Sequence, residues 1–127
     1  MEYQKCITDL GLRILPLNGK KPLSHWKEEA SLDLVPTASY GIVCDKIAVA
    51  DTDTREKAIW WYRNRIRTAV MIRTPGGGVH FYYAGSPDLP NGQYDKWDLR
   101  AGGNGYVVGP GSVIKGKVYA LIGEILS

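Results

Sequence analysis

The apolar positions at the start of the chain have the spacing of one helix face. They are Tyr3, Cys6, Ile7 and Leu10. Gly11 follows them and is suited to end a helix, because glycine readily adopts left-handed backbone conformations. The pattern predicts a short amphipathic helix, and the apolar residues of 12–17 predict a strand after it.

Two short apolar runs in the middle of the chain, 40–44 and 47–51, are separated only by Asp45 and Lys46. Runs of this length bounded by polar residues are typical of buried strands, so we expect two strands joined by a tight turn. The preceding region, 18–36, contains turn formers and no clear period. We expect a basic turn there, followed by irregular or weakly helical structure.

After Asp53 the spacing of apolar residues becomes helical. Thr54 can cap the helix, and Ile59, Tyr62 and Ile66 are placed to pack inward with arginines on the outer face. Short apolar segments predict further strands at 69–73, 79–83, 97–100, 106–109 and 118–121. Strands with two interposed helices and mostly hairpin connections predict an α+β domain, in which helices flank one face of a mixed, largely antiparallel sheet.

Length and composition fit a single domain spanning 1–127. The 127 residues are 44% hydrophobic and 23% charged, which is enough apolar material for one core. Every apolar run is far shorter than the roughly 20 residues of a membrane-spanning helix, and we expect a soluble, cytoplasmic protein. Two cysteines, Cys6 and Cys44, are too few for a disulfide framework and do not have zinc-site spacing, so we expect both in the core.

The distribution of charge is more informative than its sum. The net charge of +3 does not by itself indicate a nucleic-acid-binding protein. Basic residues gather between 55 and 73, however, and only Glu56 opposes them there. They are Arg55, Lys57, Arg63, Arg65, Arg67 and Arg73. Such a local excess can contact phosphate groups.

Asp51 and Asp53 are the first candidates for chemistry. Residues two apart on a strand point to the same face, so both carboxylates would project together at the end of the 47–51 strand. Held that close they would repel unless a cation lies between them, and such oxygen ligands suit Mg²⁺ or Mn²⁺. In the alternative interpretation, Asp53 and Thr54 only cap the next helix and Asp51 is a solvated strand end.

A glycine-rich loop and a histidine follow at 74–80. Residues 76–78, which are Gly76, Gly77 and Gly78, would let a phosphate approach the backbone amides closely. His80 could donate a hydrogen bond to a phosphate oxygen. In the alternative interpretation, the glycines only form a flexible hairpin and His80 is an ordinary strand residue.

Asp98 is a third acidic candidate. From a neighbouring strand it could complete the set of carboxylates that two-metal phosphoryl transfer uses. Spacing alone does not show that the acids meet, and Asp98 could equally be a surface residue paired with Arg100.

The order of these features resembles the N-terminal domain of the bifunctional primase-polymerases (prim-pol) found in plasmid and phage replication proteins, which belong to the archaeo-eukaryotic primase superfamily. The segments 11–17 and 20–23 look like the family's opening strand and basic turn, and Trp26 looks like its nearby aromatic residue. The segment 105–112 resembles a strand and turn that come late in the family's pattern. The resemblance therefore covers most of the chain.

The candidate chemistry falls on the family's motifs. Asp51 and Asp53 stand where the first motif places its metal-binding acids, 73–82 is similar to the second, and Asp98 corresponds to the acid of the third. Gly78 stands where much of the superfamily has a small hydroxyl residue.

The resemblance implies an RRM-like core in which the three acids hold two divalent ions, Mg²⁺ or Mn²⁺. It implies that His80 and the glycine-loop amides bind the phosphates of a nucleoside triphosphate. The residues that would add charge stabilisation are Arg73, Arg100 and Lys21. The implied reaction is addition of a dNTP or NTP to a primer on a DNA or RNA template in a prokaryotic cell. A helicase domain or protein as partner, and membership of a longer replication protein, stay open.

Two other functions stay open on the sequence alone. A domain of the same fold could bind single-stranded nucleic acid without catalysis, through the arginine-rich helix and nearby aromatic residues. Those aromatic residues are Trp60, Trp61, Tyr82 and Tyr83. A metal-dependent nuclease could use the same carboxylates on phosphodiesters. Divalent-dependent nucleotide binding separates the first alternative from nucleotidyl transfer, and product analysis separates the second.

Overall fold

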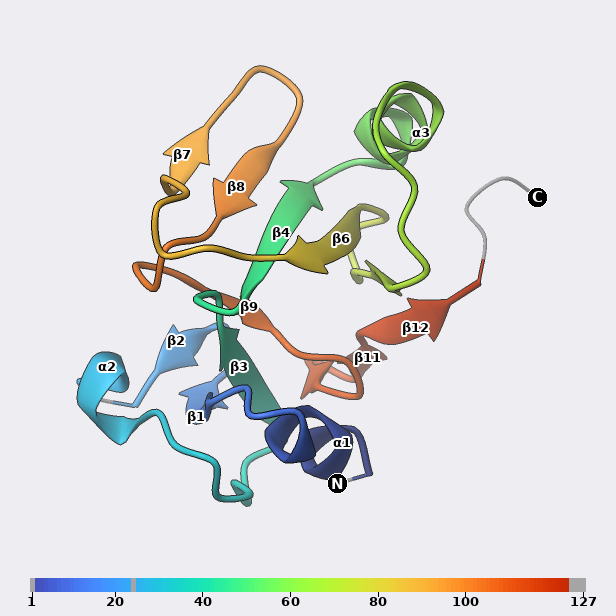
Figure 1. Cartoon of the computed structure of the whole chain (residues 1–127). Helices are drawn as coiled ribbons and strands as arrows, with labels where there is room; N and C mark the ends of the chain where they lie inside the picture. Colours follow the sequence, from blue (N-terminus) through green and yellow to red (C-terminus); the bar gives the residue numbers. More distant parts are fainter. Residues whose placement is uncertain (1, 24, 124–127) are drawn as a thin grey trace.

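The computed structural model describes residues 2–23 and 25–123 (Figure 1). Its helices are α1 (Glu2–Asp9), α2 (Trp26–Glu29) and α3 (Arg55–Asn64). Its strands are β1 (Ile14–Asn18), β2 (Lys21–Pro22), β3 (Ser39–Val43), β4 (Ile47–Thr52), β5 (Met71–Arg73), β6 (Val79–Ala84), β7 (Gly92–Gln93), β8 (Asp98–Arg100), β9 (Tyr106–Val108), β10 (Val113–Ile114), β11 (Lys117–Val118) and β12 (Ala120–Ile122). The predicted α+β class is confirmed.

The strands form two main sheets and one small hairpin. One sheet has the order β2-β1-β3-β9, the other has the order β12-β5-β6-β4-β8-β7, and β10 pairs with β11. Every strand pair in the described part of the chain is antiparallel. The expectation of largely antiparallel pairing is therefore confirmed, whereas the expectation of one mixed sheet is wrong.

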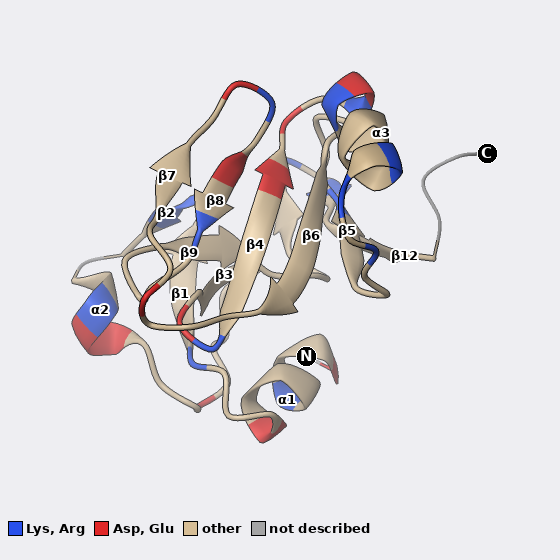
Figure 2. Cartoon of the chain, turned by 45° about the horizontal axis from the view of Figure 1, so that its top comes forward, with Lys and Arg blue, Asp and Glu red and all other residues tan. Residues whose placement is uncertain are grey.

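Helix α3 covers one face of the six-stranded sheet (Figure 2). Its N-cap is Thr54, whose hydroxyl accepts a hydrogen bond from the Lys57 backbone N–H at 3.1 Å. Ala58 is fully buried and packs in a cluster with Ala50 and Phe81 of the sheet. The prediction that Ile66 packs inward is wrong, because α3 ends at Asn64 and Ile66 is 81% exposed.

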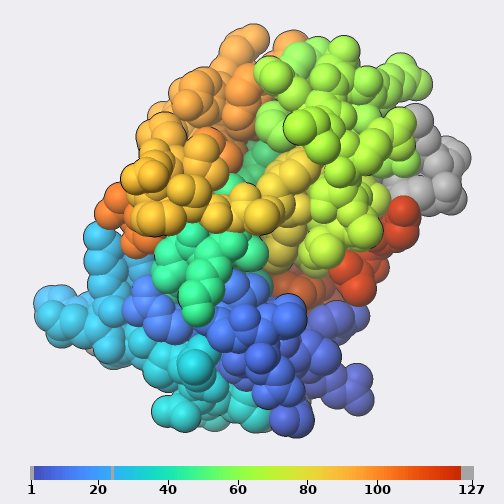
Figure 3. Space-filling model, in the orientation of Figure 1, coloured from blue at the N-terminus to red at the C-terminus, as the bar shows by residue number. Residues whose placement is uncertain are grey.

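The opposite face of the same sheet packs against the rest of the molecule. Val49 belongs to a core cluster with Ile14, Ile42 and Ile7 of α1. Neighbouring strand residues alternate between faces, so Val49 and Ala50 point to opposite sides of β4. The expectation that the helices lie on one face is therefore wrong, and Figure 3 shows α3 (green) and α1 (blue) at opposite ends of the molecule.

The two cysteines differ in their environment. Cys44 is buried in the core, as expected, whereas Cys6 is exposed because it lies on the outer side of α1.

The short helix α2 lies in the region expected to be irregular or weakly helical. None of the helices in residues 2–23 and 25–123 has the length and apolar character needed to cross a membrane.

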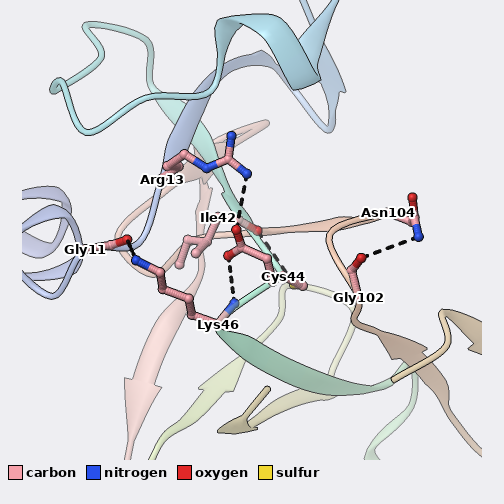
Figure 4. A network of polar contacts seen from close by, with 8 residues as sticks. Gly11, Arg13, Ile42, Cys44, Lys46, Gly102 and Asn104 are labelled. Carbon is pink, nitrogen blue, oxygen red and sulfur yellow. Dashed lines mark hydrogen bonds and ion pairs between the residues drawn. The ribbon is translucent and has the colours of Figure 1, made fainter. Parts of the chain in front are cut away.

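Strands β3 and β4 do not form the predicted hairpin. β3 lies between β1 and β9, whereas β4 lies between β6 and β8, so the chain crosses from one sheet to the other at the intervening turn. The Arg13 guanidinium lies 3.2 Å from the Asp45 carboxylate, and Lys46 Nζ donates to the Gly11 carbonyl at 3.1 Å (Figure 4). These contacts fix the crossing to the segment that follows α1.

Candidate active site

Asp51 lies at the centre of a row of polar residues across the six-stranded sheet. In the antiparallel register it is directly opposite His80 of β6 on one side and Asp98 of β8 on the other. Directly opposite residues point to the same face of a sheet. The three side chains therefore share one face, and Figure 2 shows the acidic end of β4 beside the acidic start of β8.

The carboxyl group of Asp51 is held in its charged form. Its side chain is 26% exposed, and its Oδ1 lies 3.3 Å from His80 Nε2. Burial opposes ionisation of this carboxyl. The hydrogen bond from His80 and the positive charges of His80, Arg100 and Lys20 outweigh burial, so the pKa of Asp51 lies below its usual value of 3.8. Asp51 is therefore ionised at neutral pH, as a carboxylate that binds a cation must be.

His80 is almost completely buried beside Asp51. Its side chain is 7% exposed, and its ring centre lies 6.1 Å from that of Tyr119. Within the described residues its Nδ1 has no hydrogen-bond partner. A buried polar atom without a partner is costly and indicates that a ligand or a water completes the site.

Asp98 is paired with Arg100, two residues further along β8. The guanidinium lies 3.6 Å from the carboxylate, and both side chains are about one-third exposed. This is the pairing that the sequence left open as an alternative to metal binding. A partly exposed pair of this kind contributes about 1 kcal/mol or less, so a stronger ligand can displace it.

Asp53 lies beyond the end of β4 and is turned toward α3. Its carboxylate is 75% exposed and lies 3.2 Å from the Lys57 ammonium group. Among the residues that the structure describes, no three His, Cys, Asp or Glu side chains lie close enough together to hold a metal ion. The predicted set of three acids is thus not assembled: Asp51 and Asp98 are neighbours, and Asp53 is paired elsewhere.

A cleft of about 970 Å³ opens beside this row of residues. Asp51, Asp53 and His80 line it, whereas Asp98 is not a lining residue but is paired with Arg100, which is one. The basic side chains that line the cleft are Lys20, Lys21, Arg100, Lys115 and Lys117. A cleft that combines carboxylates with surrounding basic side chains suits a polyanionic ligand that binds together with a metal ion.

The glycine loop is a tight turn between β5 and β6. The Gly77 N–H donates to the Thr74 carbonyl at 3.0 Å, and the Thr74 N–H donates to the Gly78 carbonyl at 2.9 Å. Gly77 has a φ of 92°, and a Cβ at position 78 would collide with the Thr52 carbonyl oxygen. Only glycine fits at position 78 on this backbone, which explains the missing hydroxyl.

Of the three loop glycines predicted to contact phosphate, only one lies at the cleft. Gly76 lines the cleft, whereas Gly77 and Gly78 are not among its lining residues. Two of the loop's amides are used by the turn itself. The turn and the close approach of β6 to β4 therefore account for Gly77 and Gly78 without a ligand.

Arg73 lies on the wrong face of the sheet for the predicted role. Its neighbour Ile72 is the cross-strand partner of His80, and consecutive strand residues alternate between faces. The exposed Arg73 side chain therefore lies on the α3 side, away from the cleft. Lys21 and Arg100, the other two predicted cations, do line the cleft.

The cleft also contains residues that the sequence analysis did not single out. Tyr106 packs edge-on against Trp26 with ring centres 5.3 Å apart, and its hydroxyl donates to the Lys20 carbonyl at 2.8 Å. Lys115 and Lys117 come from the β10–β11 hairpin. The intervening glycine is a turn signal that could have predicted this hairpin, but nothing in the sequence indicates that it borders the same cleft.

An ionised carboxylate, a buried imidazole and a rim of cations in one α+β cleft are typical of domains that bind phosphorylated ligands. The sequence as a whole is more specific. The chain belongs to the family described as bifunctional DNA primase/polymerase, N-terminal (Prim-Pol), because the family model matches residues 4–125. Among curated proteins no match was found. The resemblance seen in the motifs is therefore confirmed over nearly the whole chain.

Proposed function

We propose that the chain is a metal-dependent nucleotidyltransferase that adds a dNTP or NTP to the 3′-hydroxyl of a primer on a DNA or RNA template. Membership of the Prim-Pol family supports a primase or polymerase activity. The observation that carries the proposal is the row of His80, Asp51 and Asp98 beside a cleft with a basic rim. The proposed setting is replication in the cytoplasm of a prokaryotic cell, and an RRM-like core and a helicase partner stay predictions.

The residues present fit a hard divalent cation at Asp51 and Asp98. Both supply carboxylate oxygens from one face of adjacent strands, and Mg²⁺ or Mn²⁺ typically takes one or two protein carboxylates together with water and phosphate oxygens. Asp53 would join them only after leaving Lys57, which an exposed ion pair permits. Two ions held there would lower the pKa of the 3′-hydroxyl and neutralise charge on the phosphates.

The other residues of the site have separate roles in this proposal. His80 holds one oxygen of Asp51 and so fixes the orientation of that carboxylate. A phosphate oxygen of the nucleotide would satisfy the unpartnered ring nitrogen of His80. Arg100 and Lys21 would contact the remaining phosphate oxygens, where fixed positive charges stabilise a transferring phosphoryl group.

Primer extension with Mn²⁺ or Mg²⁺ tests the proposal. Asp51→Asn and Asp98→Asn should each lower the extension rate by about a hundredfold or more, the scale seen when one preorganised electrostatic group is lost. Asp33→Asn is the matched control, because Asp33 is exposed and lies outside the cleft. Circular dichroism confirms that each variant folds. Wild-type extension by folded Asp51→Asn would refute the assignment.

A nucleic-acid-binding domain without catalysis is the second candidate. It is favoured by the two ion pairs that already neutralise Asp53 and Asp98. In that case Mn²⁺ would not raise the affinity for a nonhydrolysable nucleotide, which calorimetry measures. A nuclease would instead shorten a labelled strand in the extension assay.

A further inference from the structure

Stacked aromatic rings join α3 to the β7–β8 hairpin. We call this group the aromatic bridge, and its members are Trp60, Trp61, Tyr94 and Trp97. The ring of Trp97 stacks with Trp60 at 5.8 Å between centres and with Tyr94 at 5.0 Å, and Trp61 meets it edge-on at 5.2 Å. Figure 3 shows α3 (green) and the hairpin (orange) meeting at the top of the molecule.

Two of the four rings of the aromatic bridge pack against the hydrophobic core, and two do not. Trp61 and Trp97 pack against the cluster beneath α3, and Trp61 Nε1 donates to the Tyr83 hydroxyl at 2.9 Å. Within the described residues, Trp60 and Tyr94 are not part of any of the three core clusters, and Tyr94 is 48% exposed. Two partly exposed rings that stack on the same tryptophan and lie outside the core clusters indicate a contact surface.

Positive charge lies beside Trp60. The Arg65 guanidinium carbon lies 5.4 Å from the ring centre of Trp60, and Lys96 Nζ lies 5.5 Å from it. Arg63 and Arg67, close to Arg65 in the chain, are also exposed, and Arg67 lies 3.9 Å from the ring centre of Tyr62. Across residues 2–23 and 25–123, none of these four cations pairs with a carboxylate. The surface therefore suits a ligand that carries both negative charge and flat apolar groups.

We propose that the aromatic bridge binds single-stranded nucleic acid. The bases of the nucleic acid would stack on Trp60 and Tyr94, and its phosphate groups would contact Arg65 and Lys96. A single strand fits better than a duplex, because only unpaired bases expose their ring faces for stacking. An acidic protein surface would match the charge but would leave the rings without stacking partners.

The aromatic bridge is separate from the candidate active site. Trp97 directly precedes β8 and packs against the cluster beneath α3, whereas Asp98 shares the other face of the sheet with Asp51, so the bridge lies on the α3 side and the cleft on the other. The inference goes beyond the proposed function, because it assigns a second nucleic-acid contact that needs no metal and no nucleotide.

Fluorescence anisotropy with a labelled oligo(dT) tests the inference. Trp60→Ala and Tyr94→Ala should each weaken binding about tenfold, as expected when one stacked base loses its aromatic partner. Trp60→Phe should keep most of the affinity. Arg65→Ala should weaken binding and lower the slope of log affinity against log salt by about one. The matched controls are Tyr3→Ala, a 42% exposed ring on α1, and Lys5→Ala, both of which should bind as wild type.

The outcomes separate this inference from the proposed catalysis. The binding assay contains no metal and no nucleotide, so its result does not depend on whether the protein extends primers. Wild-type binding by Trp60→Ala and Tyr94→Ala, with melting temperatures unchanged, would overturn the inference. Equal competition by duplex DNA would also overturn it, in favour of a phosphate-only surface. Binding to anionic phosphatidylserine vesicles without binding to oligo(dT) would overturn it in favour of a membrane surface.

Discussion

Asp51 and Asp98 are directly opposite each other on the antiparallel strands β4 and β8, although they lie far apart in the chain. Both carboxylates point to the face that borders the cleft, so one cation can contact both. The unfolded chain has no such pair. Cation binding should therefore stabilise the folded protein selectively.

The first prediction is a metal-dependent rise in melting temperature. At a concentration one hundred times the Kd, Mn²⁺ should add about 2.7 kcal/mol to the free energy of unfolding, and Asp98→Asn should lose most of this gain. Thermal unfolding over a Mn²⁺ titration measures it, with Asp88→Asn as an exposed control. An equal gain in Asp98→Asn would show that the cation binds elsewhere.

The second prediction concerns pH. In His80→Gln the pKa of Asp51 should rise, because burial still opposes ionisation while the positive charge and hydrogen bond of His80 are lost. A carboxyl whose folded-state pKa lies below 3.8 stabilises the fold above that value, and this stability is lost as pH falls through the folded-state pKa. The acid-unfolding limb should therefore move to higher pH in the variant.

Carbon-detected NMR of the Asp51 carboxyl and urea unfolding over an acid pH series measure this change. His25→Gln is the matched control, because His25 is exposed. If the Asp51 pKa is the same in His80→Gln and the wild type, the His80 contact does not set it.

The third prediction tests the fit of the glycine loop. Gly78→Ser should destabilise the fold by about 2 kcal/mol or more, because its Cβ would collide with the Thr52 carbonyl oxygen. Gly76→Ser should change stability by about 0.5 kcal/mol or less, because a Cβ there meets open space. Urea unfolding compares the two. Similar stability of both variants would mean that β4 and β6 lie further apart than described.

The fourth prediction concerns Lys115 at the tip of the β10–β11 hairpin. Its φ of 53° is the only positive value among the non-glycine residues described, and Gly116 follows with a φ of 77°. Two positive φ angles in a two-residue loop favour glycine or asparagine. Lys115→Gly should therefore raise the free energy of unfolding by about 0.5 to 1 kcal/mol, whereas Lys117→Gly in the adjoining strand should lower it. Thermal unfolding of the pair gives the sign of each change.

The fifth prediction concerns Asp53. Removing its partner with Lys57→Ala frees the carboxylate to turn toward Asp51. If Asp53 is a metal ligand, Mn²⁺ should bind severalfold more tightly, because no ion pair has to be broken first. Calorimetric titration measures the affinity, and Lys5→Ala is the control, because it breaks an exposed ion pair of the same spacing with Asp9 on α1. Unchanged affinity would remove Asp53 from the ligand set.

The sequence predicted individual elements well where one physical signal dominated. The run 47–51 became β4 (Ile47–Thr52), and Thr54 caps α3 as expected, because apolar continuity and a capping hydroxyl are local signals. The run 118–121 was predicted as one strand but divides into β11 and β12 around Tyr119. The break falls where the chain changes its partner strand, because β11 pairs with β10 and β12 pairs with β5.

The sequence did not predict which strands pair or how many sheets they form. Alternation along a strand assigns residues to faces, but it does not say which strand lies beside which. The crossing between β3 and β4 therefore looked like a hairpin. Once β5 is known to pair with β6 in this register, the same alternation places Arg73 on the face opposite to His80. The ion pairs of Asp53 and Asp98 depend on rotamers, which spacing does not determine.

The position of Thr52 limits how this site can evolve. Its buried hydroxyl donates to the Val79 carbonyl at 2.8 Å and accepts from the Val79 N–H at 3.2 Å on the core side of β4. A slip of β4 by one residue would break both bonds and drive the Asp51 charge into the hydrophobic interior. The row of His80, Asp51 and Asp98 therefore cannot be shifted along the sheet without breaking the strand register. A change in what the cleft binds would therefore have to come from its surrounding turns and the β10–β11 hairpin, while β4 itself stays fixed.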